Sequence, residues 1–449
     1  MRNIESPLIH RRDWLQAATW LGAAALIGKS RADDPRPQVV NPRATSGDRK
    51  HAPDWQQRLT ITVGNDQGDL RGETQQVIQA AVDHLSGFGG GTVRLLAGTW
   101  RMRNSVYLRS NIRLVGEGDK SILIKEPSTS TPLAADSDWF DQEITLADSA
   151  GFALGDGVCL QTKNADTGAA VVLKRTLVAN SGNRFRLDRP LRENLWQLGK
   201  STCSTLFPIL SGDGIEQVAI ENLTLDGNRA ANDNLNGNYG GCVFLQDCND
   251  VGIRQVTGRN YNGDGFSWQI CHDVVVENCR SLDHADLGLH PGSGSQRPRI
   301  RGNQLERNGI GIFFCWGVKF GLAEANQIVD NRIGVSIGHR DTDNLIRDNV
   351  IRGSLETGVL YRPERGPGFA PHRNRLEANQ IVDNGGPGAA AIDLQGASQG
   401  NLIARNVIRE TRSPAMRVGI RISQATEELQ LVDNHIDGFA TAVDDQRKG

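Results

Sequence analysis

A short phrase of the form x-x-N-x-[ILV] recurs in the second half of the chain and constrains the fold more than any other feature. Asn303, Asn326 and Asn349 hold the same place in this phrase and are 23 residues apart. Each phrase is followed by a short apolar run that begins with glycine, as in "GIFFC", "GVSIG" and "GVLYR". Such a repeat, with two or three strands and no helical periodicity, is typical of one coil of a parallel β-solenoid. We therefore expect an all-β parallel β-helix.

The repeated asparagines and two matching cysteines are interpreted as structural. Asparagine tolerates left-handed turns, and its amide can bond to the coils on both sides. Cys248 and Cys271 occupy matching phrases 23 residues apart, in a chain with only seven cysteines. We expect them to be buried free thiols on neighbouring coils rather than part of a disulfide framework.

Composition and breaks in the repeat indicate how the chain is divided. Hydrophobic residues make up 38% of the 449, which suits a narrow core, and the net charge of −2 gives no reason to expect nucleic-acid or membrane-surface binding. The repeat predicts the main β-helix at residues 208–445. Longer strand-like runs predict a β insertion at 130–207, which could form a wall of a binding groove. An Asn- and Gly-rich loop at 226–241 should lie beside the same face.

The N-terminal segment resembles a twin-arginine export signal. "HRRDWLQAATWLGAAALIGKSRA" holds paired Arg11 and Arg12, then an apolar stretch too short to span a bilayer, with a small-residue ending near Ala32. The resemblance implies a signal peptide at 1–32, a linker at 33–58, the twin-arginine machinery as a partner, and export to the periplasm or beyond with no stable membrane span after processing. A buried N-terminal helix is the alternative.

The region 59–129 predicts an N-terminal cap and the first coils. Val77, Ile78, Ala81, Val82 and Leu85 form the apolar face of a helix that ends at Gly87. The order of this helix, "GGGTV", "GTW" and "SNIRLVGEG" resembles the start of the pectate-lyase-like, right-handed parallel β-helix superfamily. With the later repeats, the resemblance covers most of residues 60–440 and implies a right-handed β-helix whose end is closed by the helix.

Equivalent positions of successive coils lie about 4.8 Å apart, so residues far apart in sequence form columns. Aligning the second strands on their glycines puts Ser267, His290, Phe313, Ser336 and Leu360 in one column. Ionisable residues concentrate on the coils between 260 and 365, and this clustering predicts a site. The candidate catalytic residues are Asp264, Asp286, His290 and His339. The candidate substrate-binding residues are Lys319, Arg340, Arg362, Trp316 and Arg297.

One loop raises the question of a metal. Asp341 and Asp343, in "GHRDTDN", could hold Ca²⁺ through carboxylate oxygens, or could instead pair with Arg340 and Arg347. No spaced ligand motif is present, so no cofactor is firmly predicted.

The phrases "NYNGDGFSW" and "DHADLGLHPGSGS" partly resemble the polygalacturonase-like glycoside hydrolases, in which an N-T-D-G strand precedes a G-D-D strand one coil later. The resemblance implies that Asp264 and Asp286 correspond to the aspartate of the first motif and the first aspartate of the second. Leu287 stands in place of the second aspartate of that pair, and the family histidine is missing from "NGIGIFF". His290 and His339 are candidates to replace it.

These residues leave three functions open. The leading hypothesis is an exported enzyme that cleaves the glycosidic bonds of a polysaccharide by hydrolysis, which needs two carboxyl groups. The second is a lyase on a uronate-containing glycan, which needs a base and cations beside the uronate carboxylate. The third is a non-catalytic solenoid that binds glycan. The sequence does not choose the sugar or the linkage.

Overall fold

The computed structural model describes residues 54–413 and 417–448. The predicted signal peptide at 1–32 and most of the predicted linker lie outside the described residues. Residues 54–58 include a short 3-10 helix, η2 (Trp55–Gln57). Within the described ranges, no helix is long and apolar enough to cross a membrane.

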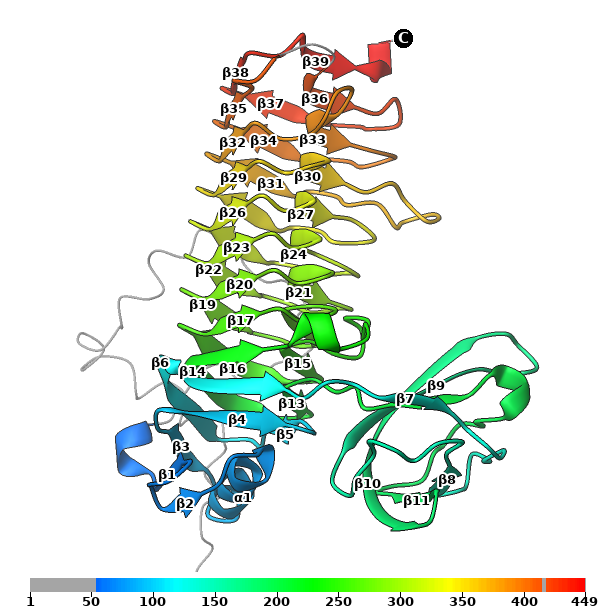
Figure 1. Cartoon of the computed structure of the whole chain (residues 1–449). Helices are drawn as coiled ribbons and strands as arrows, with labels where there is room; N and C mark the ends of the chain where they lie inside the picture. The colour runs from blue at the N-terminus through cyan, green and yellow to red at the C-terminus, as the bar shows by residue number, and fades with distance from the viewer. Residues whose placement is uncertain (1–53, 414–416, 449) are drawn as a thin grey trace, which may run out of the picture. The chain divides into compact units, whose positions relative to one another are not determined.

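Most of the chain winds into coils whose strands form three parallel ladders (Figure 1). The first ladder contains β16 (Asn249–Arg254), β19 (Val275–Glu277), β22 (Arg299–Arg301), β25 (Leu322–Glu324), β28 (Leu345–Arg347), β31 (Arg375–Glu377), β34 (Leu402–Ala404) and β37 (Gln430–Val432). The second contains β17 (Thr257–Arg259), β20 (Arg280–Leu282), β23 (Gln304–Glu306), β26 (Gln327–Val329), β29 (Val350–Arg352), β32 (Gln380–Val382), β35 (Val407–Arg409) and β38 (His435–Asp437).

The third ladder begins within the first coils, at residue 106, and runs to residue 445. It contains β5 (Val106–Tyr107), β13 (Leu210–Asp213), β15 (Val243–Gln246), β18 (Phe266–Gln269), β21 (Leu287–Gly292), β24 (Ile310–Phe313), β27 (Ile333–Ile337), β30 (Thr357–Tyr361), β33 (Ala390–Leu394), β36 (Val418–Ile422) and β39 (Thr441–Asp445). Among them, β18, β21, β24, β27, β30 and β36 are the glycine-opened strands that the repeat predicts, so the predicted parallel β-helix is confirmed.

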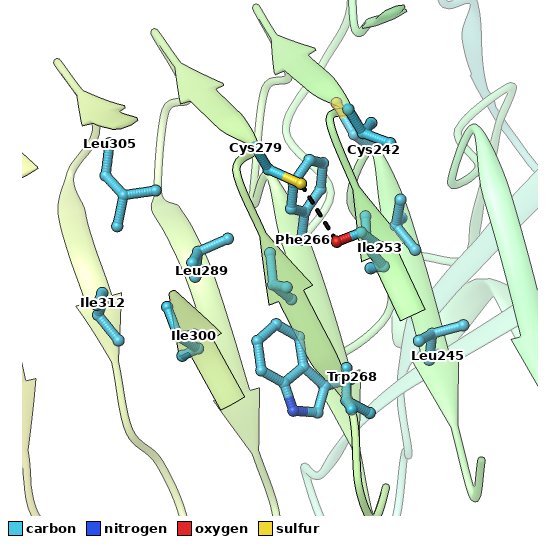
Figure 2. Packing of buried hydrophobic residues seen from close by; sticks show 14 of the residues in the cluster. Cys242, Leu245, Ile253, Phe266, Trp268, Cys279, Leu289, Ile300, Leu305 and Ile312 are labelled. Atoms are coloured by element: carbon cyan, nitrogen blue, oxygen red, sulfur yellow. Dashed lines mark hydrogen bonds between the residues drawn. The ribbon is translucent and has the colours of Figure 1, made fainter. Parts of the chain in front are cut away.

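The core fills the inside of the coils with one or two apolar side chains from each strand. In β26 and β32, for example, the central side chain is buried and its two neighbours are more exposed, because side chains alternate along a strand. Figure 2 shows Leu289, Ile300 and Trp268 pointing into this shared interior. Trp268 is therefore a core residue. Cys248 and Cys271 are buried free thiols, also as predicted.

A ladder of buried asparagines follows the turns between the first two strand ladders. The side-chain oxygen of Asn326 accepts hydrogen bonds from the backbone N–H and Nδ2 of Asn303, at 3.0 and 2.9 Å. Asn326 in turn donates to Asn349 Oδ1 at 2.8 Å. The predicted bonding between coils is thus observed. The left-handed residue, however, is the one before each asparagine, such as Ala325 with φ 55°.

The N-terminal cap consists of one helix and the first strands. Helix α1 (Gln75–Ser86) buries Ile78, Ala81, Val82 and Leu85, and it packs against β3 and β5 at the N-terminal end of the stack (Figure 1). The cap and first coils also contain β1 (Thr60–Gly64), β2 (Leu70–Arg71), β3 (Gly91–Leu95), β4 (Gly98–Met102), β6 (Ile112–Lys125) and β14 (Glu216–Asp226). The helix covers apolar interior that a terminal coil would otherwise expose.

Between β6 and β14 the chain leaves the coils and forms a separate antiparallel sheet with its own small core. Its strands are β7 (Ser130–Pro132), β8 (Glu143–Thr145), β9 (Gly157–Lys163), β10 (Ala170–Ser181), β11 (Arg184–Leu187) and β12 (Thr202–Ser204), in the order β7-β12-β9-β10-β11-β8. The core includes Leu146, Leu160, Leu177 and Phe185. This is the predicted β insertion.

Candidate active site

The third ladder carries the predicted site, and its strands align as the glycine spacing predicts. Ser267 pairs with His290, and Phe313 pairs with Ser336, so each lies one rung from its partner. Glycine opens these strands because the coils approach closely there. A methyl group added at Gly288 would lie 2.7 Å from the carbonyl oxygen of Gly311 on the next coil.

Asp264 and His290 form a buried hydrogen-bonded pair. His290 Nδ1 lies 2.7 Å from Asp264 Oδ2, and the side chains are 5% and 1% exposed. The backbone N–H of Leu287 donates to the other carboxylate oxygen at 3.2 Å. Burial raises the pKa of Asp264, and the bond to His290 opposes that shift. The pair fixes the orientation of the imidazole ring.

The Asn- and Gly-rich loop at 226–241, predicted to lie beside this face, covers the pair. Gly237 packs so closely on Asp264 that an added methyl group would overlap the carboxylate. Ser267 Oγ holds the loop by donating to the carbonyl oxygen of Gly237 at 2.7 Å. Asn234 Nδ2 donates to Asp286 Oδ2 at 3.0 Å, which links the loop to a second carboxylate.

A cavity of about 950 Å³ opens over the pair. His290 and Asp286 line it, and no described residue hydrogen-bonds the second ring nitrogen of His290, Nε2. Two arginines, Arg332 and Arg365, also line the cavity and are exposed. A base candidate, a carboxylate and two cations therefore share one space.

A second cavity, of about 660 Å³, adjoins the first and shares Ile270, Ser293 and Trp316 with it. Trp316 is 39% exposed. Lys319 and Arg340, both predicted to bind substrate, line the second cavity. The structure therefore brings Asp264, Asp286 and His290 to the first cavity, Lys319 and Arg340 to the second, and Trp316 to both.

The remaining predicted residues lie elsewhere. His339 is 5% exposed and packs on Trp316, with ring centroids 5.7 Å apart, but lines neither cavity. Burial, together with neighbouring arginines, lowers its pKa to about 4. Arg362 is mostly covered by the Phe313 ring, with its side chain 11% exposed, and it donates to Ser336 Oγ at 2.8 Å. The expectation that these two residues face the site is corrected: aromatic side chains cover both.

Arg297 is likewise engaged within the fold. It forms a two-point ion pair with Asp273, at 3.0 and 2.8 Å, and it lines neither cavity. Its predicted role in substrate binding is corrected on this ground: the guanidinium joins two neighbouring coils.

The two carboxylates considered for Ca²⁺ are held by protein donors. Asp341 is fully buried, accepts the backbone N–H groups of Val318 and Gly338, both at 2.8 Å, and has its pKa raised to about 7 by burial. Asp343 pairs with Arg373 at 2.8 Å. The alternative prediction, that these two aspartates pair with Arg340 and Arg347, is therefore wrong, because their ion-pair partners are Arg362 and Arg373. Residues 54–413 and 417–448 contain no cluster of three or more metal-ligating side chains.

Arg332 is a cavity residue that the sequence reasoning missed. It stands two residues before a strand-opening glycine, at the position that Asp286, Gly309 and Glu356 hold on other coils. Arg332 Nη1 donates to Glu356 Oε2 at 2.7 Å, and Asp286, Gly309 and Arg332 line the cavity on successive coils. Extending the column alignment two residues upstream would have found it.

Comparisons with known proteins support the fold. The family described as "Right handed beta helix region" matches residues 201–351 and 241–388. No curated protein matches the chain. The A-module of mannuronan C-5 epimerase AlgE6 from Azotobacter vinelandii is similar with a TM-score of 0.53 and 16% identity, over 82% of this chain and 91% of that chain.

Two further solved structures share the backbone less closely. A protein titled "Glycoside hydrolase" has a TM-score of 0.49 and 12% identity, over 84% of this chain and 96% of its own. The Dettilon tailspike protein gp208 has a TM-score of 0.46 and 10% identity, over 79% and 64%. The chain is thus a right-handed parallel β-helix, the fold implied by its resemblance to the pectate-lyase-like superfamily.

Proposed function

We propose that the protein is an exported enzyme that breaks glycosidic bonds of an acidic polysaccharide by β-elimination. The observation that carries the proposal is the buried Asp264–His290 pair beside a cavity that also contains cations. Elimination needs a base that removes the proton from the carbon next to a uronate carboxylate. It also needs positive charge that stabilises the negative charge developing on that carboxylate.

His290 is the proposed base. With Nδ1 donating to Asp264, the neutral ring keeps its lone pair on Nε2, and this nitrogen would take the proton from the carbon beside the carboxylate. The freed electron pair forms a C=C bond as the glycosidic oxygen leaves, and that oxygen takes a proton from water. Asp264 acts as a positioning residue that sets the tautomer and stabilises the imidazolium.

Arg332 and Arg365 supply the cations of the first cavity. A guanidinium binds a carboxylate through two parallel hydrogen bonds, which both orients the sugar and neutralises its charge. Lys319 and Arg340 in the adjoining cavity would bind a carboxylate on a neighbouring sugar of the same chain.

Hydrolysis is less well supported by this geometry. A hydrolase of the two-carboxyl type needs both carboxyl groups to reach the scissile bond or its water. Asp264 is 0% exposed, and both of its oxygens are engaged, with His290 and with the Leu287 N–H. Of these two aspartates, Asp286 is the one whose carboxylate is only half-buried in the cavity wall, so a single carboxyl group is accessible to substrate.

A first substrate follows from the similar epimerase module, which by its name acts on mannuronan. Purified protein is incubated with polymannuronate and with other acidic and neutral polysaccharides. Absorbance from new C=C bonds and the release of reducing ends are followed separately. Elimination gives both signals. Reducing ends without absorbance would refute the proposal in favour of hydrolysis, and silence with retained glycan binding would favour a non-catalytic role.

Variants test the assignment of the base. His290→Gln should lose nearly all activity, and Asp264→Asn should lower kcat by about 10²–10⁴-fold, the usual contribution of a positioned acid–base group. His435→Gln is the matched control, because His435 is exposed on β38, in another strand ladder. Full activity of the His290 variant would remove the pair from the mechanism.

Export is the second part of the proposal. It is supported by the twin-arginine pattern at residues 1–32, cut near Ala32. Replacing Arg11 and Arg12 together with lysine should retain the protein in the cytoplasm. Unchanged export of that variant would contradict the twin-arginine route.

A further inference from the structure

A third cavity, of about 550 Å³, lies between the insertion and the first coils, and the proposed chemistry does not use it. Lys174 and Arg189 line it from the insertion, and Phe244 and Gln246 line it from β15. Its lining contains four basic side chains and two carboxylates. The cavity therefore favours an anionic ligand.

Lys174 is the central cation of this cavity. Its Nζ lies 3.7 Å from the centroid of the Phe244 ring, and no carboxylate of the described chain forms an ion pair with it. Burial lowers the pKa of Lys174 to about 8, so the ammonium is still mostly protonated at neutral pH. An anion would stabilise this half-buried charge, which the nearby Asp213 carboxylate balances only from beyond ion-pair distance.

Arg189 is a second available cation, held in place by its neighbours. Its own ion pair is loose, with Nε 3.9 Å from Asp188 Oδ2, and its side chain is 61% exposed. Arg175 Nη2 donates to the carbonyl oxygens of Pro190 and Leu191, at 2.8 and 2.6 Å, and so fixes the segment that follows Arg189. The Arg189 guanidinium therefore extends from a segment that these two hydrogen bonds hold in place.

The third cavity shares one lining residue with the first. Gln246 lines both, and Asp213, Gln246 and Gln269 are register partners on three consecutive rungs. At about 4.8 Å per rung, these rungs span about 10 Å along the ladder, so a polysaccharide chain that fills both cavities must extend beyond that length.

We infer that the third cavity is a remote subsite for an acidic sugar of the same polysaccharide chain whose reacting sugar lies beside His290. Lys174 and Arg189 would bind the carboxylate of that sugar. The inference rests on the proposed function, and it assigns the β insertion a role in recognising long chains over short ones.

Binding to an inactive protein tests the subsite apart from catalysis. In the His290→Gln background, titration calorimetry follows mannuronate and galacturonate oligomers, each as a trimer and as an octamer. Adding Lys174→Met or Arg189→Gln should weaken octamer binding about ten-fold, as expected for loss of a charged hydrogen bond, and should leave trimer binding unchanged. Lys174→Arg should retain octamer affinity.

Lys163→Gln is the matched control, because Lys163 is an exposed lysine on β9 of the same insertion and does not line the cavity. Unchanged octamer affinity in the Lys174 and Arg189 variants overturns the subsite, even where the wild-type enzyme still forms C=C bonds. Equal weakening of trimer and octamer also overturns it. Cleavage assays on the wild type report separately on the proposed function.

Discussion

The asparagine ladder predicts that Asn326→Ala is strongly destabilising, although the change removes only a small polar side chain. Asn326 makes four side-chain hydrogen bonds inside the core, to Asn303, Ile300 and Asn349. Asn303 Nδ2 keeps a second acceptor, the carbonyl oxygen of Val276, at 2.9 Å. The backbone N–H of Asn303 loses its acceptor, and the Ile300 carbonyl loses this donor.

The magnitude follows from the orphaned groups. A buried donor or acceptor left without a partner costs about 1–3 kcal/mol, so the two groups together predict a loss of about 2–6 kcal/mol in the free energy of unfolding. The amide oxygen of Asn349 adds little to this loss, because it still accepts the Asn326 backbone N–H at 3.0 Å.

Denaturant unfolding measures the total loss, and hydrogen exchange locates it. The Asn303 amide should exchange much faster in the variant than in the wild type. Asn434→Ala is the control, because Asn434 is half-buried on the last rung, where water can replace its bonds to Asn406. Stability within about 0.5 kcal/mol of wild type for Asn326→Ala would refute the reasoning, as would equal losses at both positions.

Two further predictions concern a buried lysine and a buried glycine. Lys125 is 2% exposed, and burial lowers its pKa to about 7. Above pH 7 the unfolded chain therefore binds more protons than the folded chain, so the free energy of unfolding should rise as the pH rises toward the ordinary pKa of lysine. Lys125→Met should remove up to about 1.4 kcal/mol per pH unit of that slope, measured by denaturant unfolding at pH 7 to 9; an unchanged slope would contradict it. Gly237→Ala should displace the loop from Asp264 and lower kcat about a hundred-fold while the melting temperature shows that the fold is kept; wild-type kcat would show that the close packing is not needed.

The periodic residues made the fold and the register predictable. Glycine is needed where neighbouring coils approach closely, and asparagine where one amide bonds to two coils, so both recur at fixed places. From these places the pairing of Ser267 with His290 followed directly. The same alignment puts Asp264 in a different column from His290, so the 2.7 Å contact between their side chains did not follow from it.

Depth within the fold was not predictable in the same way. Spacing gives the rung and the face of a residue, whereas its access to a cavity depends on the side chains that pack over it. Trp316 and Phe313 cover His339 and Arg362, which have the right residue type and rung. Lys174 lies outside the repeat, so no alignment relates it to Phe244, 70 residues away in sequence.

The asparagine ladder also bears on how such a chain can diversify. Successive ladder residues are separated by 23 residues in one part of the chain and by 30 between Asn349 and Asn379, yet the amide contacts remain near 2.9 Å. The extra residues are accommodated outside the ladder. Whole coils or longer loops can therefore be gained without rebuilding the interior, which leaves the outer surface free to evolve toward new ligands.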